Sequence, residues 1–211
     1  MLNNIEVLFH SSIRIIENKV IYFDPYNIDK NYNDADIVFI THDHYDHYSK
    51  QDIGKVKTEK TVFVIPKNMI NKLISDGIDE KLIITVEPNK KYSIKDIEFE
   101  TVPAYNTNKP FHPKENEWVG YKITLNNIRY YITGDTDITK ENKNVKCDVA
   151  FVPVGGTYTM DYKEAAELIN HIHPKIAVPI HYGSVVGTKK DAIEFIKLLD
   201  DGIEGKILIK N

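Results

Sequence analysis

The segment ITHDHYDHYS, residues 40–49, constrains this chain more than any other feature of its sequence. It places three histidines and two aspartates within six positions, directly after the apolar run DIVFI, which is typical of a buried strand. Clustered titratable groups at such a place would repel one another or stay unsatisfied unless they held a cation. The alternative is a solvated turn that happens to be rich in histidine.

The spacing within this segment favours metal binding. His42 and His44 are two positions apart, and in extended backbone such residues point to the same side, so both imidazoles can reach one cation. Asp46 and His47 follow where the chain should turn into a helix beginning near Ser49, which would let them serve a second cation. Imidazole nitrogen and carboxylate oxygen suit Zn²⁺, Mn²⁺ or Fe²⁺.

The bulk properties exclude several function classes. The chain has 211 residues, which fits a single α/β domain spanning 1–211. Its formal net charge is -4 and no basic stripe is visible, which argues against a nucleic-acid partner. No apolar stretch reaches the ~20 residues that cross a bilayer, and the N-terminus lacks a signal-peptide pattern, so we expect a cytoplasmic protein without membrane contact. Cys147, the only cysteine, precedes an apolar run and is predicted to be a buried, inert thiol.

Short apolar runs recur along the chain and predict strands, several of them buried on both faces because they are continuous rather than alternating. The predicted strands cover residues 5–10, 13–17, 20–24, 36–41, 61–66, 81–87, 96–102, 119–125, 128–134, 148–154, 175–181 and 206–210. Amphipathic patterns predict helices at 49–56, 67–77, 161–172 and 188–202. This order predicts an α/β fold with helices on the outer faces of its sheets. The long stretch 103–118 has no periodicity, and such loops are usually functional or mobile.

Two further candidate ligands stand directly after apolar runs. Asp135 follows IRYYI within ITGDTD, and His181 follows IAVPI. Both should therefore lie at the carboxyl ends of strands, where ligands of α/β proteins collect. Taken alone, Asp135 would be interpreted as a turn residue and His181 as a core histidine. Beside the 42–47 cluster, we interpret both as metal ligands.

HDHYDH resembles the H-x-H-x-D-H signature of the metallo-β-lactamase superfamily. FHSSIRI…IYFDPY is similar to the opening of the branch that includes ascorbate-phosphate lactonases, while YYITGDTD and VPIHYGS are similar to the strands that end in the bridging aspartate and the last histidine ligand. These landmarks run in the family's order from about residue 5 to 188. The resemblance implies a four-layer αββα sandwich with a dinuclear metal site, bridged here by Asp135.

One position departs from that family pattern. A histidine is expected after the strand DIEFETV, but the region reads PAYNTNKPFHP, with Tyr105 and Asn106 at the expected place. We expect the loop to fold back so that His112 completes the first site. The alternatives are that His10 takes this role or that the first site is only weakly ligated, which would leave one tightly held ion.

Other residues are expected to support the ligands or touch substrate. A ligating imidazole needs its second ring nitrogen held by an acceptor, and Asp24 and Asp43 are placed to provide one. His10 and Tyr182 are further candidates for supporting a ligand or contacting substrate. His171 and His173, at the end of a predicted helix, are interpreted as surface residues.

Together, the residues predict a metal-dependent hydrolase in which a metal-bound hydroxide attacks a small ester, lactone or phosphodiester. The first ion is assigned to His42, His44 and His112, the second to Asp46, His47 and His181, with Asp135 bridging. Asp46 is also the candidate catalytic carboxylate, because it can orient the nucleophile or carry a proton to the leaving group. We expect one or two zinc ions, with manganese or iron as alternatives. The alternative functions are a metal-dependent nuclease and a non-hydrolytic di-iron or metal-binding protein; substrate and oligomeric state stay open.

Overall fold

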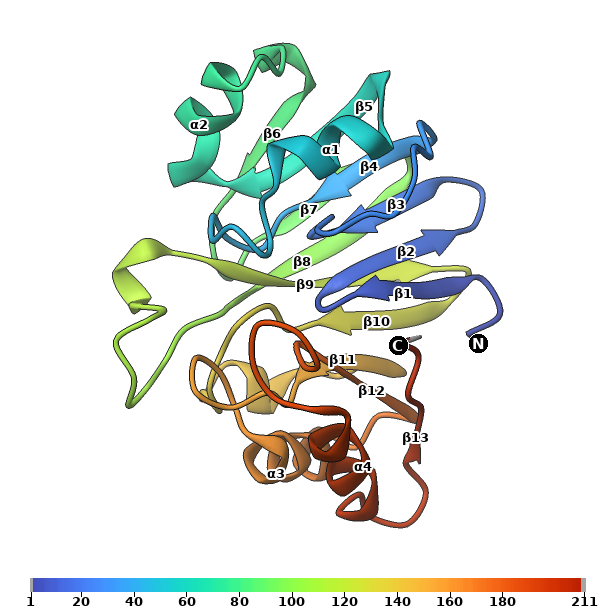
Figure 1. Cartoon of the computed structure of the whole chain (residues 1–211), viewed down its shortest axis with the longest axis vertical. Helices are drawn as coiled ribbons and strands as arrows, with labels where there is room; N and C mark the ends of the chain where they lie inside the picture. The colour runs from blue at the N-terminus through green and yellow to red at the C-terminus, as the bar shows by residue number, and fades with distance from the viewer. Residues whose placement is uncertain (1, 210–211) are drawn as a thin grey trace. The chain divides into compact units, whose positions relative to one another are not determined.

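The structure is a computed structural model that describes residues 2–209. The chain divides into two compact units, of which the first runs to Glu87 and takes in Ile209, and the second spans Pro88–Leu208. Each unit is built on one mixed β-sheet with helices packed on a face of it (Figure 1). The predicted α/β class is confirmed.

The sheet of the first unit has the strand order β1-β2-β3-β4-β5-β6. Its strands are β1 (Ile5–Phe9), β2 (Ser12–Ile16), β3 (Val20–Phe23), β4 (Ala35–Phe39), β5 (Lys57–Pro66) and β6 (Ile83–Val86). The pairs β1–β2 and β2–β3 are antiparallel, whereas β3, β4, β5 and β6 run parallel. Because β3 and β4 are parallel neighbours, the residues that follow them emerge at the same edge of the sheet.

Helices α1 (Lys50–Val56) and α2 (Ile70–Ser75), with the 3₁₀ turns η1 (Lys67–Met69) and η2 (Glu80–Leu82), belong to the same unit. Ile53 and Leu73 from the two helices join Val38 and Phe63 of the sheet in one buried apolar cluster. Ser49 caps α1 by accepting a hydrogen bond from the main-chain nitrogen of Asp52 at 3.2 Å. The α1 helix therefore begins next to Ser49, as the sequence predicts.

The sheet of the second unit has the order β13-β12-β11-β10-β9-β8-β7. Its strands are β7 (Lys91–Ile94), β8 (Ile97–Pro103), β9 (Val119–Leu125), β10 (Ile128–Ile132), β11 (Val149–Pro153), β12 (Ile176–Ile180) and β13 (Glu204–Gly205). Strands β7 to β10 pair antiparallel, and β10 to β13 pair parallel. The segments that follow β10, β11 and β12 therefore leave the sheet at a shared edge.

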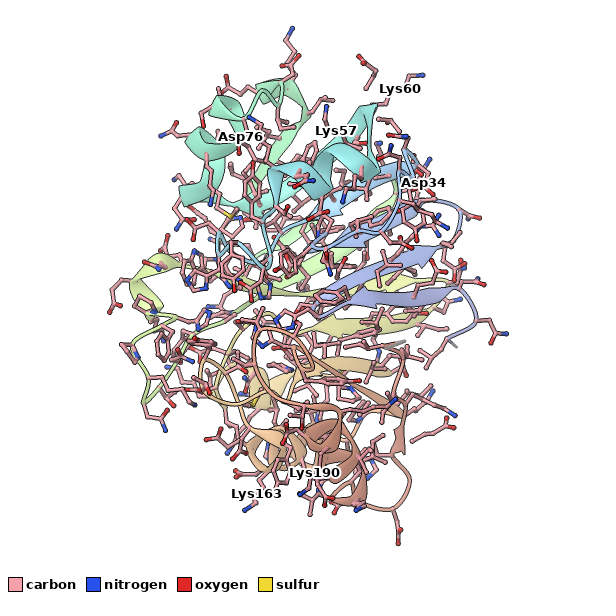
Figure 2. All side chains as sticks on the ribbon, viewed as in Figure 1. Asp34, Lys57, Lys60, Asp76, Lys163 and Lys190 are labelled. Carbon is pink, nitrogen blue, oxygen red and sulfur yellow. The ribbon has the colours of Figure 1, made fainter. Side chains whose placement is uncertain are left out.

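Helices α3 (Tyr162–Ile172) and α4 (Lys189–Lys197) pack on β11 and β12, and the 3₁₀ turns η3 (Lys114–Asn116) and η4 (Asn142–Asn144) lie in loops. A reciprocal capping box between Asp161 and Glu164 starts α3, which then buries Leu168 and Ile169. The polar faces of the two helices carry exposed lysines such as Lys163 and Lys190 (Figure 2).

Some element predictions need correction. The strand β7 was missed because its sequence, KYSI, is short and mostly polar. The predicted strand 206–210 is wrong for residues 206–209, since only Glu204–Gly205 pairs with β12, and residue 210 lies outside the described residues. The helix predicted at 188–202 ends at Lys197. Within residues 2–209, no helix has both the length and the apolar character needed to cross a membrane.

Candidate metal centre

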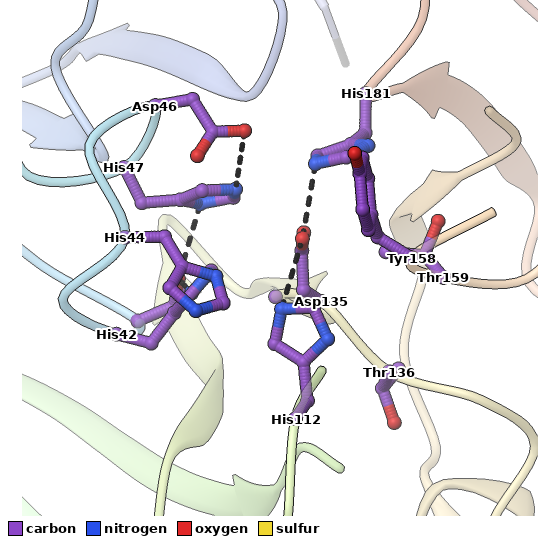
Figure 3. A network of polar contacts seen from close by, with 12 residues as sticks. His42, His44, Asp46, His47, His112, Asp135, Thr136, Tyr158, Thr159 and His181 are labelled. Atoms are coloured by element: carbon purple, nitrogen blue, oxygen red, sulfur yellow. Dashed lines mark hydrogen bonds and ion pairs between the residues drawn. The ribbon is translucent and has the colours of Figure 1, made fainter. Parts of the chain in front are cut away.

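The loop between β4 and α1 carries the cluster His42, His44, Asp46 and His47 (Figure 3). The strand ends at Phe39, so the cluster lies beyond the strand rather than on its last residues. The main-chain nitrogens of His47 and Tyr48 both donate to the carbonyl oxygen of His44, at 3.0 and 2.8 Å. This turn separates His42 and His44 from Asp46 and His47, as the sequence predicted.

The first two histidines of the loop converge on one point. Nε2 of His42 and Nδ1 of His44 are 3.1 Å apart. Two nitrogens bound to one tetrahedral zinc at ~2.0–2.1 Å lie roughly 3.3 Å from each other, so this pair fits a single cation. Nδ1 of His42 is 2.9 Å from the hydroxyl of Thr41, which leaves Nε2 as the ligand atom.

Asp46 and His47 form a second group together with His10, which follows β1. Oδ2 of Asp46 lies 3.3 Å from Nε2 of His10 and 3.8 Å from Nε2 of His47. The ligand atoms of these three buried residues all lie within 4.8 Å of one another. Within the first unit, His10 thus lies beside Asp46 and His47, which suits a role next to the second ion.

Asp24 supports this loop from the end of β3. Its Oδ2 accepts hydrogen bonds from Nδ1 of His47 and from the Thr41 hydroxyl, both at 2.7 Å, and its Oδ1 accepts from the Thr41 main chain at 2.8 Å. Because the carboxylate only accepts, it holds the proton on Nδ1 of His47 and leaves Nε2 to bind metal. Burial raises the pKa of the Asp24 carboxyl, and the hydrogen bonds from His47 and Thr41 oppose that rise.

Asp43 does not hold an imidazole, contrary to the sequence-based expectation. Its carboxylate faces Nζ of Lys72 at 3.9 Å, and its carbonyl oxygen accepts a hydrogen bond from the same amine at 2.8 Å. The physical reason is that α2 brings Lys72 against the loop. Asp24, 23 residues from His47 in the chain, is the carboxylate that holds the second ring nitrogen of this ligand.

The second unit gathers another ligand set around Asp135. Oδ2 of this aspartate lies 3.0 Å from Nε2 of His181 and 3.3 Å from Nε2 of His112 (Figure 3). Asp135 follows β10 and His181 follows β12, two strands that flank β11 and both run parallel to it. His112 comes from the long loop between β8 and β9. One oxygen within reach of two imidazoles is the arrangement that a bridging carboxylate requires.

The loop that carries His112 folds back on its own beginning. The Asn106 main-chain nitrogen donates to the His112 carbonyl oxygen at 2.8 Å, and Oδ1 of Asn106 accepts from the His112 main-chain nitrogen at 2.9 Å. Oδ1 also faces Nδ1 of His112 at 3.1 Å. Asn106 therefore stands beside His112 and supports it. No pattern in the sequence indicates this role, although Asn106 occupies the position where the family resemblance implies a histidine.

Several site residues have a strained backbone. His10, Asp24 and His181 have φ values of 49°, 44° and 57°, a left-handed region that side chains rarely adopt. Such conformations cost on the order of 1–3 kcal/mol each and cluster at functional sites. Close packing also limits the His181 segment, because a Cβ atom on Gly155 would overlap the carbonyl oxygen of His181.

The remaining candidates fall outside these ligand groups. His171 and His173 are exposed at the end of α3, as expected for surface residues. Tyr182 is buried, which raises its pKa to about 12, and its hydroxyl has no hydrogen-bond partner among residues 2–209. Cys147 is buried with its pKa raised to about 12, so the thiol stays protonated and inert, as predicted.

The donor set fits a divalent metal. Each unit by itself holds imidazole nitrogens and a carboxylate, and in each unit a second ring nitrogen faces a side-chain oxygen that fixes the ring. Buried imidazoles grouped around carboxylates, without thiolate, suit Zn²⁺, Mn²⁺ or Fe²⁺.

Comparison with known proteins places the chain in a family. The family model described as the beta-lactamase superfamily domain matches residues 4–181. A UPF0173 protein of Pyrococcus abyssi is 33% identical over 171 residues, covering 79% of this chain and 77% of the relative. A UPF0173 metal-dependent hydrolase of Staphylothermus marinus is 28% identical over 227 residues, covering 97% and 94%.

A solved structure agrees with these relatives. The crystal structure of a candidate metal-dependent hydrolase from Parabacteroides distasonis is similar with a TM-score of 0.85 and 32% sequence identity, covering 98% of this chain and 93% of that chain. The predicted metallo-β-lactamase fold is thereby confirmed. The chain belongs to the metallo-β-lactamase superfamily, among its metal-dependent hydrolases.

Proposed function

We propose that the protein hydrolyses a small ester, lactone or phosphodiester with two divalent cations, most simply zinc. The observation that carries this proposal is the position of Asp135 Oδ2, which lies 3.0 Å from Nε2 of His181 and 3.3 Å from Nε2 of His112. A carboxylate oxygen that lies close to the Nε2 atoms of two imidazoles suits the bridging role in a dinuclear hydrolytic site.

We propose the ligand assignment that the sequence and the family pattern predict. The first ion would be bound by His42, His44 and His112 and the second by Asp46, His47 and His181, with Asp135 as the bridging residue. The 3.1 Å separation of the His42 and His44 nitrogens supports the first group. The Asp24–His47 hydrogen bond supports the second group, because it leaves Nε2 of His47 as the ligand atom.

Divalent cations held by these residues would lower the pKa of a coordinated water to about 7 and polarise the carbonyl or phosphoryl oxygen of the substrate. Asp46 accepts the proton that the attacking water gives up. Hydrolysis joins the water oxygen to the carbonyl carbon or phosphorus and breaks the bond from that atom to the leaving oxygen. Asp46 then carries its proton to that leaving oxygen. His10, 3.3 Å from Asp46 Oδ2, fixes the orientation of this carboxylate.

Exposed aromatic rings beside the ligands support a substrate with an apolar group. Tyr45, between His44 and Asp46, is 63% exposed and packs edge-on against Tyr26 at 5.9 Å between ring centroids. Phe111, next to His112, is 39% exposed and packs edge-on against Tyr158 at 4.7 Å. Each ligand-bearing loop thus presents apolar area that a substrate could cover.

The test is metal analysis of the purified protein followed by a screen of esters, lactones and phosphodiesters with and without added zinc or manganese. We expect two metal equivalents per chain and turnover of at least one class, abolished in Asp46→Ala. Full activity in Asp46→Ala would overturn the mechanism. Absence of turnover in every class at full metal occupancy would overturn the hydrolase proposal. Fast cleavage of RNA at low salt would favour the nuclease alternative.

A further inference from the structure

Asp137 is a buried carboxylate that the ligand assignment leaves unused. It lies two residues beyond Asp135 and is 3% exposed. Its Oδ1 accepts from Nζ of Lys109 at 2.6 Å and from Nδ2 of Asn106 at 3.2 Å, and its Oδ2 accepts from the Thr107 main chain at 2.8 Å. All three donors come from the loop that leads to His112. Asp137 therefore ties this loop to the segment that follows β10.

These contacts decide which way the Asn106 amide points. Nδ2 donates to Asp137 Oδ1 and, at 3.0 Å, to the carbonyl oxygen of Tyr158, and both of these partners can only accept. Oδ1 accepts from the His112 main-chain nitrogen, which can only donate. A rotation of the amide by 180° would place acceptor against acceptor at one of these contacts and donor against donor at the third. The amide oxygen of Asn106 must therefore face Nδ1 of His112.

A fixed amide oxygen also fixes the proton on the imidazole. Because Oδ1 of Asn106 can only accept, it holds a hydrogen on Nδ1 of His112. An imidazole that binds metal is neutral, so its lone pair is then on Nε2, the atom that lies 3.3 Å from Asp135 Oδ2. A neutral imidazole of the other tautomer would direct an N–H, rather than a lone pair, toward this position.

We propose that Asp137 and Asn106 are positioning residues that hold His112 in the Nδ1–H tautomer and so present Nε2 to the metal. This tautomer clamp rests on the proposed function in one respect, that His112 is a metal ligand. The negative charge of Asp137 orients the amide of Asn106, the amide orients the imidazole, and Lys109 balances the buried charge at 2.6 Å. The clamp explains how a histidine far inside an aperiodic loop can replace one expected next to the strand.

The first test needs no substitution. Nitrogen-15 NMR distinguishes protonated from unprotonated ring nitrogens, and we expect Nδ1 of His112 to carry a proton in both the metal-free and the zinc-loaded protein. An unprotonated Nδ1 of His112 in the folded protein would overturn the clamp. This measurement does not depend on turnover, so it separates failure of the clamp from failure of the proposed hydrolase.

Two nearly isosteric variants test the clamp through the metal. Asn106→Asp removes the donors that face Asp137 and Tyr158, and Asp137→Asn removes the charge that orients the amide. In competition with a chromophoric chelator, each variant should bind one of the two zinc ions about 10–100-fold more weakly. The affinity for the other zinc ion should stay unchanged. The matched control is Glu141→Gln, because Glu141 binds Tyr105 and Lys114 of the same loop on a separate set of contacts.

The outcomes are distinct. The clamp is supported if Asn106→Asp or Asp137→Asn binds one ion more weakly and shows a mixed His112 tautomer. Glu141→Gln should show neither change. Unchanged tautomer and unchanged zinc affinity in both folded variants overturn it. Equal weakening in Glu141→Gln would also overturn it, because the effect would then come from the loop as a whole. If neither variant folds, the wild-type tautomer decides.

Discussion

Asp135 and His181, 46 positions apart in the chain, come within 3.0 Å of each other because β10 and β12 both run parallel to β11 and end at the same edge of the sheet. Each residue stands a short distance past the end of its strand. The contact joins a carboxylate oxygen to Nε2 of an imidazole, and His112 approaches the same oxygen. This relationship is the core of the candidate metal centre in the second unit.

Replacing Asp135 tests that relationship. Asp135→Asn keeps the shape of the side chain but removes the charge that two imidazoles share, so metal content by mass spectrometry should fall by at least one equivalent per chain, with loss of turnover. Asp191→Asn, which alters only the cap of α4, serves as the control. Wild-type metal content in Asp135→Asn would exclude a bridging role.

Asp24 and Asp43 form a matched pair for testing ligand support. Asp24→Asn weakens the acceptor that holds Nδ1 of His47, and we expect about 10–100-fold weaker zinc binding at one site. Asp43→Asn removes only a partly exposed contact with Lys72 and should leave zinc affinity unchanged. Chelator competition measures both. The interpretation fails if the two variants bind zinc equally well.

Tyr45 is predicted to act on substrate binding rather than on chemistry. Covering an exposed ring contributes about 1–2 kcal/mol, so Tyr45→Ala should raise KM for aryl or long-chain esters about 5–30-fold with little change in kcat. Ile193→Ala, an exposed apolar change on α4, is the control. A large loss of kcat at unchanged KM would contradict a role in apolar contact.

Replacing two different glycines by alanine should change the free energy of unfolding in opposite directions. Gly155→Ala forces a Cβ against the carbonyl oxygen of His181 and should lower the free energy of unfolding by about 1–3 kcal/mol. Gly54→Ala lies in α1 with no atom within 4 Å of the new Cβ and should raise it by about 0.5–1 kcal/mol. Thermal melts of the metal-free proteins compare the two. A lower Tm in both would show that the close approach at Gly155 is not the cause.

Asp148 makes stability depend on pH. Hydrogen bonds from Arg129, at 3.0 Å to Oδ2, hold the pKa of Asp148 well below its usual range. A carboxyl with a lowered pKa in the folded state stabilises fully above its unfolded pKa of about 3.9, and this stabilisation is lost as the pH falls toward the folded value. The difference in free energy of unfolding between wild type and Asp148→Asn should thus be constant from pH 7 to 5 and become smaller below pH 4. Urea unfolding of metal-free samples at each pH measures it, and a gap that widens in acid would refute the ion pair's role.

The sequence alone determined the features that depend on local pattern. Continuous apolar runs placed the strands, and their ends placed His42, Asp135 and His181, because a polar residue directly after a buried strand must emerge at the sheet edge. Buried apolar positions at helical spacing likewise revealed α3, whose capping box is visible in the letters DYKE.

Contacts between distant residues were decided only by the tertiary structure. Asp46 meets His10, 36 positions away, and His47 meets Asp24, because β1, β3 and β4 run in the same direction in one sheet and end at the same edge. No periodicity marks the loop that holds His112, and its conformation follows from hydrogen bonds among Asn106, Asp137 and Lys109. Side-chain hydrogen bonds depend on distance and direction in space, and a linear pattern carries neither. The strand ends were therefore readable in advance, whereas the partners that orient each ligand required the folded chain.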